Sequence, residues 1–101
     1  MDEFEFDLKA KVWIYEGINP WYFVTVPKKN ASEIRKRYRY YHRGWGSIPV
    51  SVTIGKTSWN TSIFWEKAGT YLLPLKREVR EKENFTSGDF VNLNIFIGNI
   101  T

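Results

Sequence analysis

The sequence lacks several residue types on which common chemistries depend. It has no cysteine and only one histidine in 101 residues. The absence of cysteine excludes disulfide bonds, thiol nucleophiles and cysteine-ligated zinc or iron-sulfur sites together. No apolar run approaches the ~18 residues that a membrane-spanning helix needs, and the chain begins with acidic residues where a secretory signal would be basic. We therefore expect a cytoplasmic protein with no membrane partner.

What the sequence does contain is typical of one folded domain. Its residues are 43% hydrophobic, 18% aromatic and 26% charged, an apolar content far above that of disordered chains. A chain of this length hides roughly 60 to 68% of its unfolded surface around a single core. We expect one domain over residues 1–101, and nothing in the sequence indicates a metal or another cofactor.

The positive charge is concentrated in one segment. The net charge is +4, yet residues 28–43 alone carry seven Lys or Arg against one Glu, a local balance of +6 that leaves −2 for the remainder. Such a dipolar surface attracts a polyanion or an acidic partner, although a charged helix and loop also serve simply to keep a protein soluble. The seven cations are Lys28, Lys29, Arg35, Lys36, Arg37, Arg39 and Arg43.

Alternation of period two opens the chain. Over residues 4–14 the even positions are apolar, and the odd positions begin with four charged residues. This period predicts one half-buried β-strand. Residues 16–20 contain a glycine and an Asn-Pro pair and predict a turn. Aromatic and β-branched residues at 21–26 then predict a second strand, which ends at Pro27.

A basic helix is expected next. Asn30, with Glu33 three residues on, approximates a capping box, so the helix is predicted over 31–40. Its apolar stripe is thin, which favours a helix on the surface with its basic side outward. The Gly-Trp-Gly sequence at 44–46 ends it.

The rest of the chain is β-rich. Alternation predicts a strand at 48–54, placed at a sheet edge or bulge because Pro49 cannot donate a ladder hydrogen bond. The remaining predicted elements are a hairpin turn at 55–56, a strand at 57–65, a short strand at 70–74, one or two helical turns within 75–82, a turn at 87–89 and a last strand at 90–97. Frequent strands without a regular βαβ rhythm favour an antiparallel or mixed barrel. We predict an all-β fold: a barrel of six to seven strands with two short helices.

Two segments share one order of features. Residues 22–54 and 70–97 each contain a strand, a proline, a basic helix, a glycine turn and a strand. Two half-barrel units that each leave an apolar face open can bury both faces by closing on one another.

The second of these segments resembles a known signature. Leu73-Pro74 through Val79-Arg80, followed by Gly88-Asp89, looks like the strand, proline, helix, Gly-Asp, strand pattern of AbrB- and MazE-type swapped-hairpin barrels, which are homodimeric DNA-binding transcription factors or antitoxins. The whole chain is similar to a more specific group of uncharacterised barrels, a domain-of-unknown-function family sometimes fused to a YdeI or OmpD-associated domain. That likeness is carried by the Phe-x-Phe start, Trp21-Tyr-Phe-Val, Pro27, Gly44-Trp-Gly46, Pro49-Val50, Trp59-x-x-Ser62, Leu73-Pro-Leu-Lys76 and Gly88-Asp89.

This resemblance implies a double-split β-barrel made by a single chain, in effect a fused pseudo-dimer. It brings no established activity and no catalytic residues to transfer. The AbrB-like pattern implies, at most, a DNA-binding fold, and fold alone does not fix function.

Cations alternate with aromatic residues between Arg37 and Trp45. This composition suits a protein that follows a phosphate backbone and stacks on bases, although rings beside a helix end also pack into a core beneath stacked arginines. Our first hypothesis is therefore nucleic-acid binding through the seven cations of residues 28–43.

A second hypothesis places a ligand at the barrel mouth. Trp59, Ser62, Lys76 and Arg80 together would supply an aromatic wall, a hydroxyl and two cations, which suit a small anion such as a carboxylate or phosphate. The competing interpretation makes Trp59 a core residue and pairs the two cations with nearby glutamates.

No catalytic residue is predicted. His42 lies among positive charges without an identifiable partner, and the sequence contains no nucleophile elbow, phosphate loop or zinc spacing. We expect a non-enzymatic binding module, with an unrecognised enzyme at the barrel mouth or a protein-protein adaptor as alternatives. The sequence leaves open whether the protein is a monomer or a homodimer.

Overall fold

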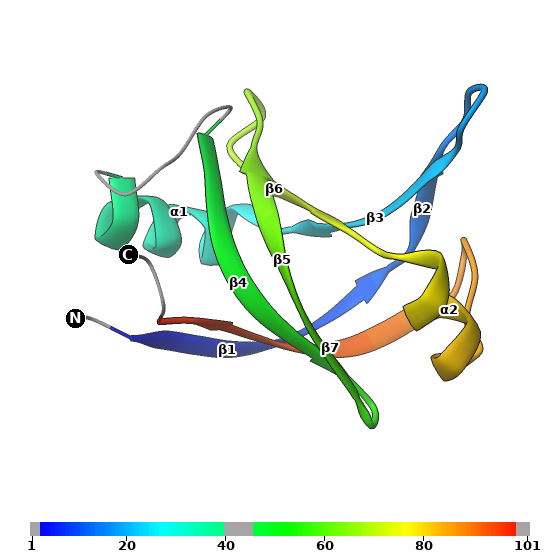
Figure 1. Cartoon of the computed structure of the whole chain (residues 1–101). Coiled ribbons are helices and arrows are strands. Elements are labelled where there is room, and N and C mark those ends of the chain that lie inside the picture. The colour runs from blue at the N-terminus through cyan, green and yellow to red at the C-terminus, as the bar shows by residue number, and fades with distance from the viewer. Residues whose placement is uncertain (1–2, 40–45, 99–101) are drawn as a thin grey trace.

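The computed structural model describes residues 3–39 and 46–98, and these form one antiparallel sheet with two helices (Figure 1). In chain order the elements are β1 (Phe4–Lys11), β2 (Trp13–Tyr15), β3 (Trp21–Val26), α1 (Lys28–Tyr38), β4 (Ser47–Ile54), β5 (Thr57–Trp65), β6 (Tyr71–Pro74), α2 (Arg77–Glu83) and β7 (Phe90–Ile97). The seven strands are ordered β1-β7-β4-β5-β6-β3-β2. The predicted β-rich class is confirmed.

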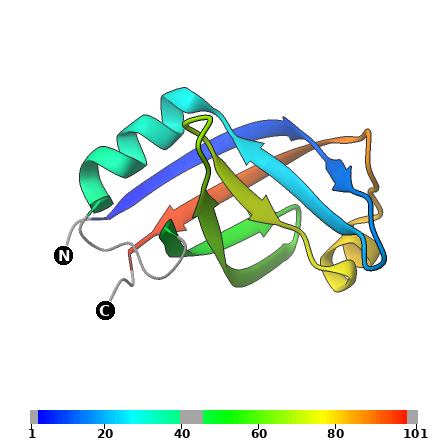
Figure 2. The same ribbon diagram turned by 90° about the horizontal axis from the view of Figure 1, so that it is seen from above.

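The first fifteen residues supply both edges of this sheet. The single strand predicted over 4–14 is divided at Val12 into β1, which pairs with β7, and β2, which pairs with β3. The Val12 amide donates a hydrogen bond to the Asp89 carbonyl, and the Val12 carbonyl accepts one from the Gly88 amide, each 2.8 Å long. Because consecutive segments lie at opposite edges, the sheet curls round toward a barrel (Figure 2).

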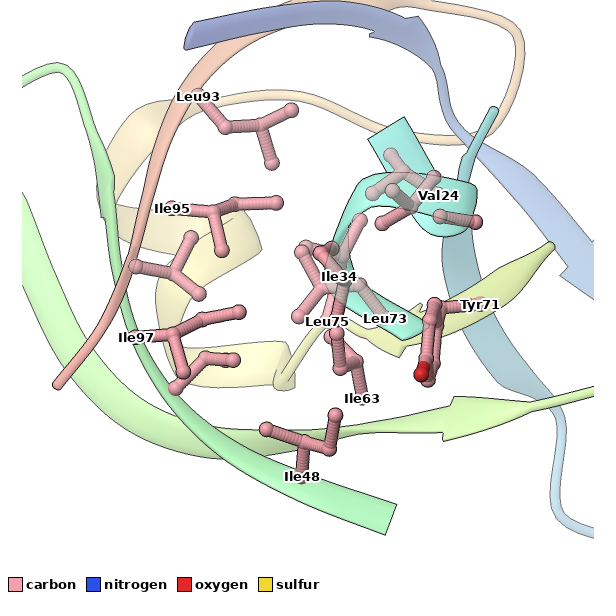
Figure 3. Close-up of a cluster of buried hydrophobic side chains, with 14 of the residues drawn as sticks. Val24, Ile34, Ile48, Ile63, Tyr71, Leu73, Leu75, Leu93, Ile95 and Ile97 are labelled. Carbon is pink, nitrogen blue, oxygen red and sulfur yellow. The ribbon is translucent and has the colours of Figure 1, made fainter. Parts of the chain in front are cut away.

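Core side chains come from one face of each long strand. Even positions of β4 and odd positions of β7 are buried, while the even positions of β1 are half-buried and pack against the same core. Ile34 of α1 and Leu73 of β6 meet Ile95 of β7 in this interior (Figure 3). The alternation predicted from the sequence is confirmed in all three strands.

Helix α1 begins earlier than predicted. It starts at Lys28, and the capping residue Pro27 has φ −67° and ψ 161° with no side-chain hydrogen bond. The Pro27 carbonyl accepts the first helical hydrogen bond, from the Ala31 amide at 2.8 Å. The capping box expected at Asn30 is therefore wrong, because Asn30 already lies inside the helix and the proline φ directs the chain into it. Part of the predicted helix end and glycine break, residues 40–45, lies outside the described residues.

Strand β4 is an edge in its first half and internal in its second. It pairs with β5 along its whole length, from Ser47 to Ile54, and with β7 from Ser51 to Ile54. The edge position predicted for Pro49 is confirmed for the half that contains it, whereas the second half of the strand has neighbours on both sides. Pro49 precedes the doubly paired half, so its missing N–H does not interrupt the pairing with β7.

The later elements lie close to their predicted positions. The β4–β5 turn, β5, β6, the turn before β7 and β7 all match, and α2 occupies the segment predicted to hold helical turns. Helices α1 and α2 lie toward opposite ends of the curled sheet (Figures 1 and 2). Within the described ranges, neither helix is long and apolar enough to cross a membrane.

The strands of the two similar segments pair with one another. Strand β3 pairs with β6, and β4 pairs with β7, both antiparallel. The strands β3 and β6 are the first strands of the two segments, and β4 and β7 are the second. The interpretation of this arrangement as a fused pseudo-dimer stays a prediction.

Candidate functional site

An open groove lined with cations lies between α1 and the β5–β6 turn. We call it the basic groove. The ribbon of α1 begins beside this turn (Figure 2). Four of its eight lining residues are Lys or Arg, and none of the eight is acidic. The lining residues are Lys28, Ser32, Arg35, Lys36, Arg39, Trp65, Ala68 and Gly69.

Helical periodicity gathers the cations. Lys28, Ser32, Arg35 or Lys36, and Arg39 recur every three or four residues and so lie along one face of α1. The neighbouring face carries Ala31, Ile34 and Tyr38, which are buried in the core. Burial of this stripe fixes the rotation of the helix and thereby turns the basic face toward the β5–β6 turn.

Arg35 is held firmly at the wall of the basic groove. Its guanidinium carbon lies 4.4 Å from the centroid of the Trp65 ring, and its side chain donates a hydrogen bond to the Tyr71 hydroxyl. Burial raises the pKa of Tyr71 to about 12, against the opposing effects of the Arg35 charge and this hydrogen bond. The rings of Trp65 and Tyr71 meet edge to face with centroids 5.2 Å apart. The three side chains join α1 to β5 and β6.

Carboxylates near the basic groove accept hydrogen bonds from residues that do not line it. Glu33 accepts a hydrogen bond from the Arg37 Nε at 3.3 Å, and the Arg37 guanidinium carbon lies 4.6 Å from the centroid of the Phe4 ring. Glu66, at the β5–β6 turn, accepts a hydrogen bond from the Thr70 hydroxyl at 2.5 Å. The lining of the basic groove therefore keeps a net positive charge.

The structure brings together four of the seven cations of the first hypothesis. Lys28, Arg35, Lys36 and Arg39 line the basic groove. Arg37 points to Phe4 of β1, and Lys29 is exposed on α1 outside the lining. Arg43, like His42 and Trp45, lies outside the described residues.

The other wall of the groove was not predicted. Trp65, Ala68 and Gly69 belong to the end of β5 and the turn after it. The sequence predicts a strand at 57–65 and assigns no element to residues 66–69. Gly69 has a φ of +88°, and a Cβ atom there would lie 3.9 Å from the Lys28 side chain. The only signal in the sequence is the glycine itself, which does not reveal that α1 lies beside it.

The four residues of the barrel-mouth hypothesis are not gathered at one surface. Trp59 packs against the core, whereas Ser62, three residues on, lies on the opposite face of β5 because side chains alternate. Arg80 lies over the Tyr22 ring, with its guanidinium carbon 3.6 Å from the ring centroid, and Lys76 is exposed just before α2.

Two nitrogens of this set are buried without partners. Among the described residues, neither the Trp59 Nε1 nor the Arg80 Nε has a hydrogen-bond partner. Each exposes less than 1 Å², so a ligand reaches them only if the packing opens. Of the nearby glutamates, Glu81 pairs with Arg77 at 3.0 Å and Glu83 accepts a hydrogen bond from the Thr57 hydroxyl at 2.6 Å.

Within residues 3–39 and 46–98, no three acidic or histidine side chains cluster as metal ligands.

The sequence matches a known protein family. None of the curated proteins compared with the sequence matches it. One family model matches, described as a domain of unknown function (DUF1905), and the match covers residues 8–95. These residues run from the middle of β1 to near the end of β7. The predicted resemblance to a domain-of-unknown-function family is confirmed, and the chain belongs to the DUF1905 family.

Proposed function

We propose that this domain is a non-enzymatic binding module for nucleic acid, which it holds by the phosphate groups in the basic groove. One observation carries the proposal: four cations and no carboxylate line a groove on one face of α1. Contacts from Lys and Arg to phosphates supply most of the sequence-independent affinity for nucleic acid. A cytoplasmic location, where such ligands are available, belongs to the same proposal.

The groove combines a fixed cation with mobile ones. Arg35 is held by Trp65 and Tyr71, so it loses little side-chain freedom when a phosphate binds. Lys28 and Lys36 form no ion pair within the described ranges, and both are exposed. Their flexible side chains can follow a phosphate backbone whose spacing varies. The expected likeness to DNA-binding AbrB-type barrels favours the same class of ligand.

Small-anion binding at the barrel mouth stays an alternative prediction. It is less well supported, because the Trp59 and Arg80 nitrogens that would bind the anion are enclosed by packing. The adaptor alternative predicts that a protein partner binds the same surfaces. Added nucleic acid would then compete with that partner for the basic groove.

The test is the salt dependence of binding to fluorescein-labelled 12-mer oligonucleotides, measured by fluorescence anisotropy. If all four lining cations contact phosphates, log Kd rises with log [NaCl] with a slope of about 2.8 for a single strand and 3.6 for a duplex. Between 50 and 200 mM NaCl the affinity then falls by about 50-fold or 150-fold, respectively. A Kd that does not respond to salt contradicts the proposal.

A matched pair of variants locates the contact. The Lys28→Gln/Lys36→Gln double variant removes two lining charges, so the slope for a single strand falls by about 1.4. The control, Lys56→Gln/Lys82→Gln, removes the same charge from exposed positions outside the groove. Equal losses of affinity in both double variants would show that net charge, and not the basic groove, attracts the nucleic acid.

A further inference from the structure

A second groove on the outer face of the sheet is lined by aromatic rings. We call it the aromatic groove. It is formed by β2, β3, β5 and β6, and none of its lining residues is charged. A leucine and a proline of β6 lie among its five rings, which belong to Trp13, Tyr15, Trp21, Phe23 and Phe64.

This outer face departs from the pattern of the rest of the sheet. Antiparallel strands with one face on a core normally present polar residues on the other. Strand β1 does so with charged side chains such as Asp7, and β7 carries Asn92 and Asn94 between its two outward phenylalanines. On the same side of the sheet, Tyr15 is 64% exposed, Trp21 57% and Phe64 37%. A contiguous exposed apolar patch of this kind marks a binding surface.

The rings are held in place before any ligand binds. Trp21 and Phe23 are nearly parallel, at 13° with centroids 6.2 Å apart, and Trp13 and Phe23 have centroids 5.0 Å apart. The Trp13 Nε1 donates a hydrogen bond to the Thr25 hydroxyl at 2.9 Å, which fixes the indole. Fixed rings offer flat faces to a planar ligand with little loss of conformational entropy.

The aromatic groove and the basic groove have lining residues that are neighbours at the end of β5. Phe64 lines the first and Trp65 the second, and these neighbours on β5 pair with Leu72 and Tyr71 of β6. Each groove therefore reaches the same end of the β5–β6 hairpin, but on opposite faces of the sheet, so a strand that occupies both passes over the end of this hairpin. From β5 across β6 and β3 to β2 the aromatic groove spans three strand spacings, roughly 14 Å, which is enough for two or three bases.

We propose that the two grooves hold one single-stranded nucleic acid, with phosphates in the basic groove and unpaired bases stacked on the rings of the aromatic groove. This inference rests on the proposed function and specifies its ligand. A duplex keeps its bases stacked inside, where exposed rings do not reach them, whereas every unpaired base presents a flat face. The uncharged lining adds no repulsion toward the strand, and the four cations of the basic groove lie along α1 beside the β5–β6 turn.

The experiment compares a 12-mer of thymidine with a duplex of the same length, at 100 mM NaCl, by fluorescence anisotropy. The Tyr15→Ala/Trp21→Ala variant removes the two most exposed rings of the groove, and circular dichroism confirms that it folds. Loss of stacking weakens binding by about 5-fold or more for each base, so we expect at least a 25-fold rise in Kd for the single strand and less than 2-fold for the duplex. The salt slope stays at its wild-type value, because no phosphate contact is lost.

Two controls sharpen the result. Phe90→Ala removes a ring that is 63% exposed but lies outside both grooves, and we expect less than a 2-fold change for either ligand. Trp21→Phe keeps a ring for stacking, so it retains most of the single-strand affinity.

The outcomes separate the two proposals. If the Tyr15→Ala/Trp21→Ala variant binds the single strand as the wild type does, while Lys28→Gln/Lys36→Gln weakens binding, the proposed function stands and this inference is overturned. If the lysine variant also binds normally, both are overturned. Sedimentation that changes from dimer to monomer in the ring variant, with unchanged single-strand affinity, would assign the aromatic groove to a second copy and overturn the inference.

Discussion

The Arg35→Ala substitution separates what this side chain contributes to the fold from what its charge contributes to binding. In the wild type, the guanidinium group stacks on Trp65 at 4.4 Å and donates a hydrogen bond to the buried Tyr71 hydroxyl. Alanine removes both interactions and leaves that hydroxyl inside the protein without its arginine. Lys36, the next residue, is exposed and contacts no ring in the described part of the chain.

The magnitude follows from these two interactions. A partly exposed cation over an aromatic ring contributes about 0.5–1 kcal/mol, and a hydrogen bond from a charged donor contributes about 1.5–3 kcal/mol. Because Arg35 is only partly buried, we take the lower part of both ranges and expect a loss of about 2–3 kcal/mol. For a domain of this size, that loss lowers the melting temperature by roughly 10 °C.

Urea unfolding followed by tryptophan fluorescence at pH 7 measures the effect. Lys36→Ala is the matched control and changes the free energy of unfolding by less than about 0.5 kcal/mol. A double-mutant cycle of Arg35→Ala with Tyr71→Phe then isolates the hydrogen bond, with an expected coupling of about 1–2 kcal/mol. If Arg35→Ala and Lys36→Ala have the same stability, or if the cycle is additive, Arg35 does not join α1 to the sheet.

Two further perturbations test the interior. Between pH 10 and 12 the wild type loses stability, because the unfolded chain releases the Tyr71 proton near pH 10 while the folded protein retains it up to about 12. The loss of unfolding free energy attributable to this group is about 2–3 kcal/mol. Urea unfolding measures it, and if the unfolding free energies of the wild type and Tyr71→Phe change with pH in parallel, Tyr71 is not the cause. Trp59→Phe removes a buried N–H that has no partner in the described residues, so relief of about 1–3 kcal/mol offsets most of the lost packing. We expect a net loss below about 1 kcal/mol in the same assay, and a loss above about 2 kcal/mol would show that the indole nitrogen has a partner.

Side-chain alternation made most of the strands predictable. In β4 and β7 the buried row consists entirely of aliphatic residues, whereas the other row contains Ser, Pro and Thr in β4 and two Asn and two Phe in β7. The bend at Val12 was not predictable, since the apolar alternation continues through it and only the pairing with Asp89 and Gly88 divides the strand. The start of α1 was misplaced because Asn30 and Glu33 match a capping pattern, whereas the geometry at Pro27 begins the helix.

The candidate site was predictable only in part. The spacing of Lys28, Arg35, Lys36 and Arg39 follows from helical geometry, so their gathering on one face could be expected once the helix was placed. That Arg37 instead reaches Phe4 depends on where β1 runs, which residues near position 37 do not encode. The aromatic groove depends on strand order, because its rings come from β2, β3 and β5, three strands that only the folded sheet brings together beside β6.

The pairing of β1 with β7 also governs when the sheet can be completed during synthesis. Phe4 pairs with Ile97, so the N-terminal edge finds its neighbour only after the last strand has left the ribosome. At about 5–20 residues per second, β1 waits roughly 5–20 s for its partner strand, whereas the β4–β5 hairpin can pair as soon as β5 has been made. Long-range pairing of this kind slows folding as well. We therefore expect the N-terminal edge of the sheet to be completed last, after β7 becomes available.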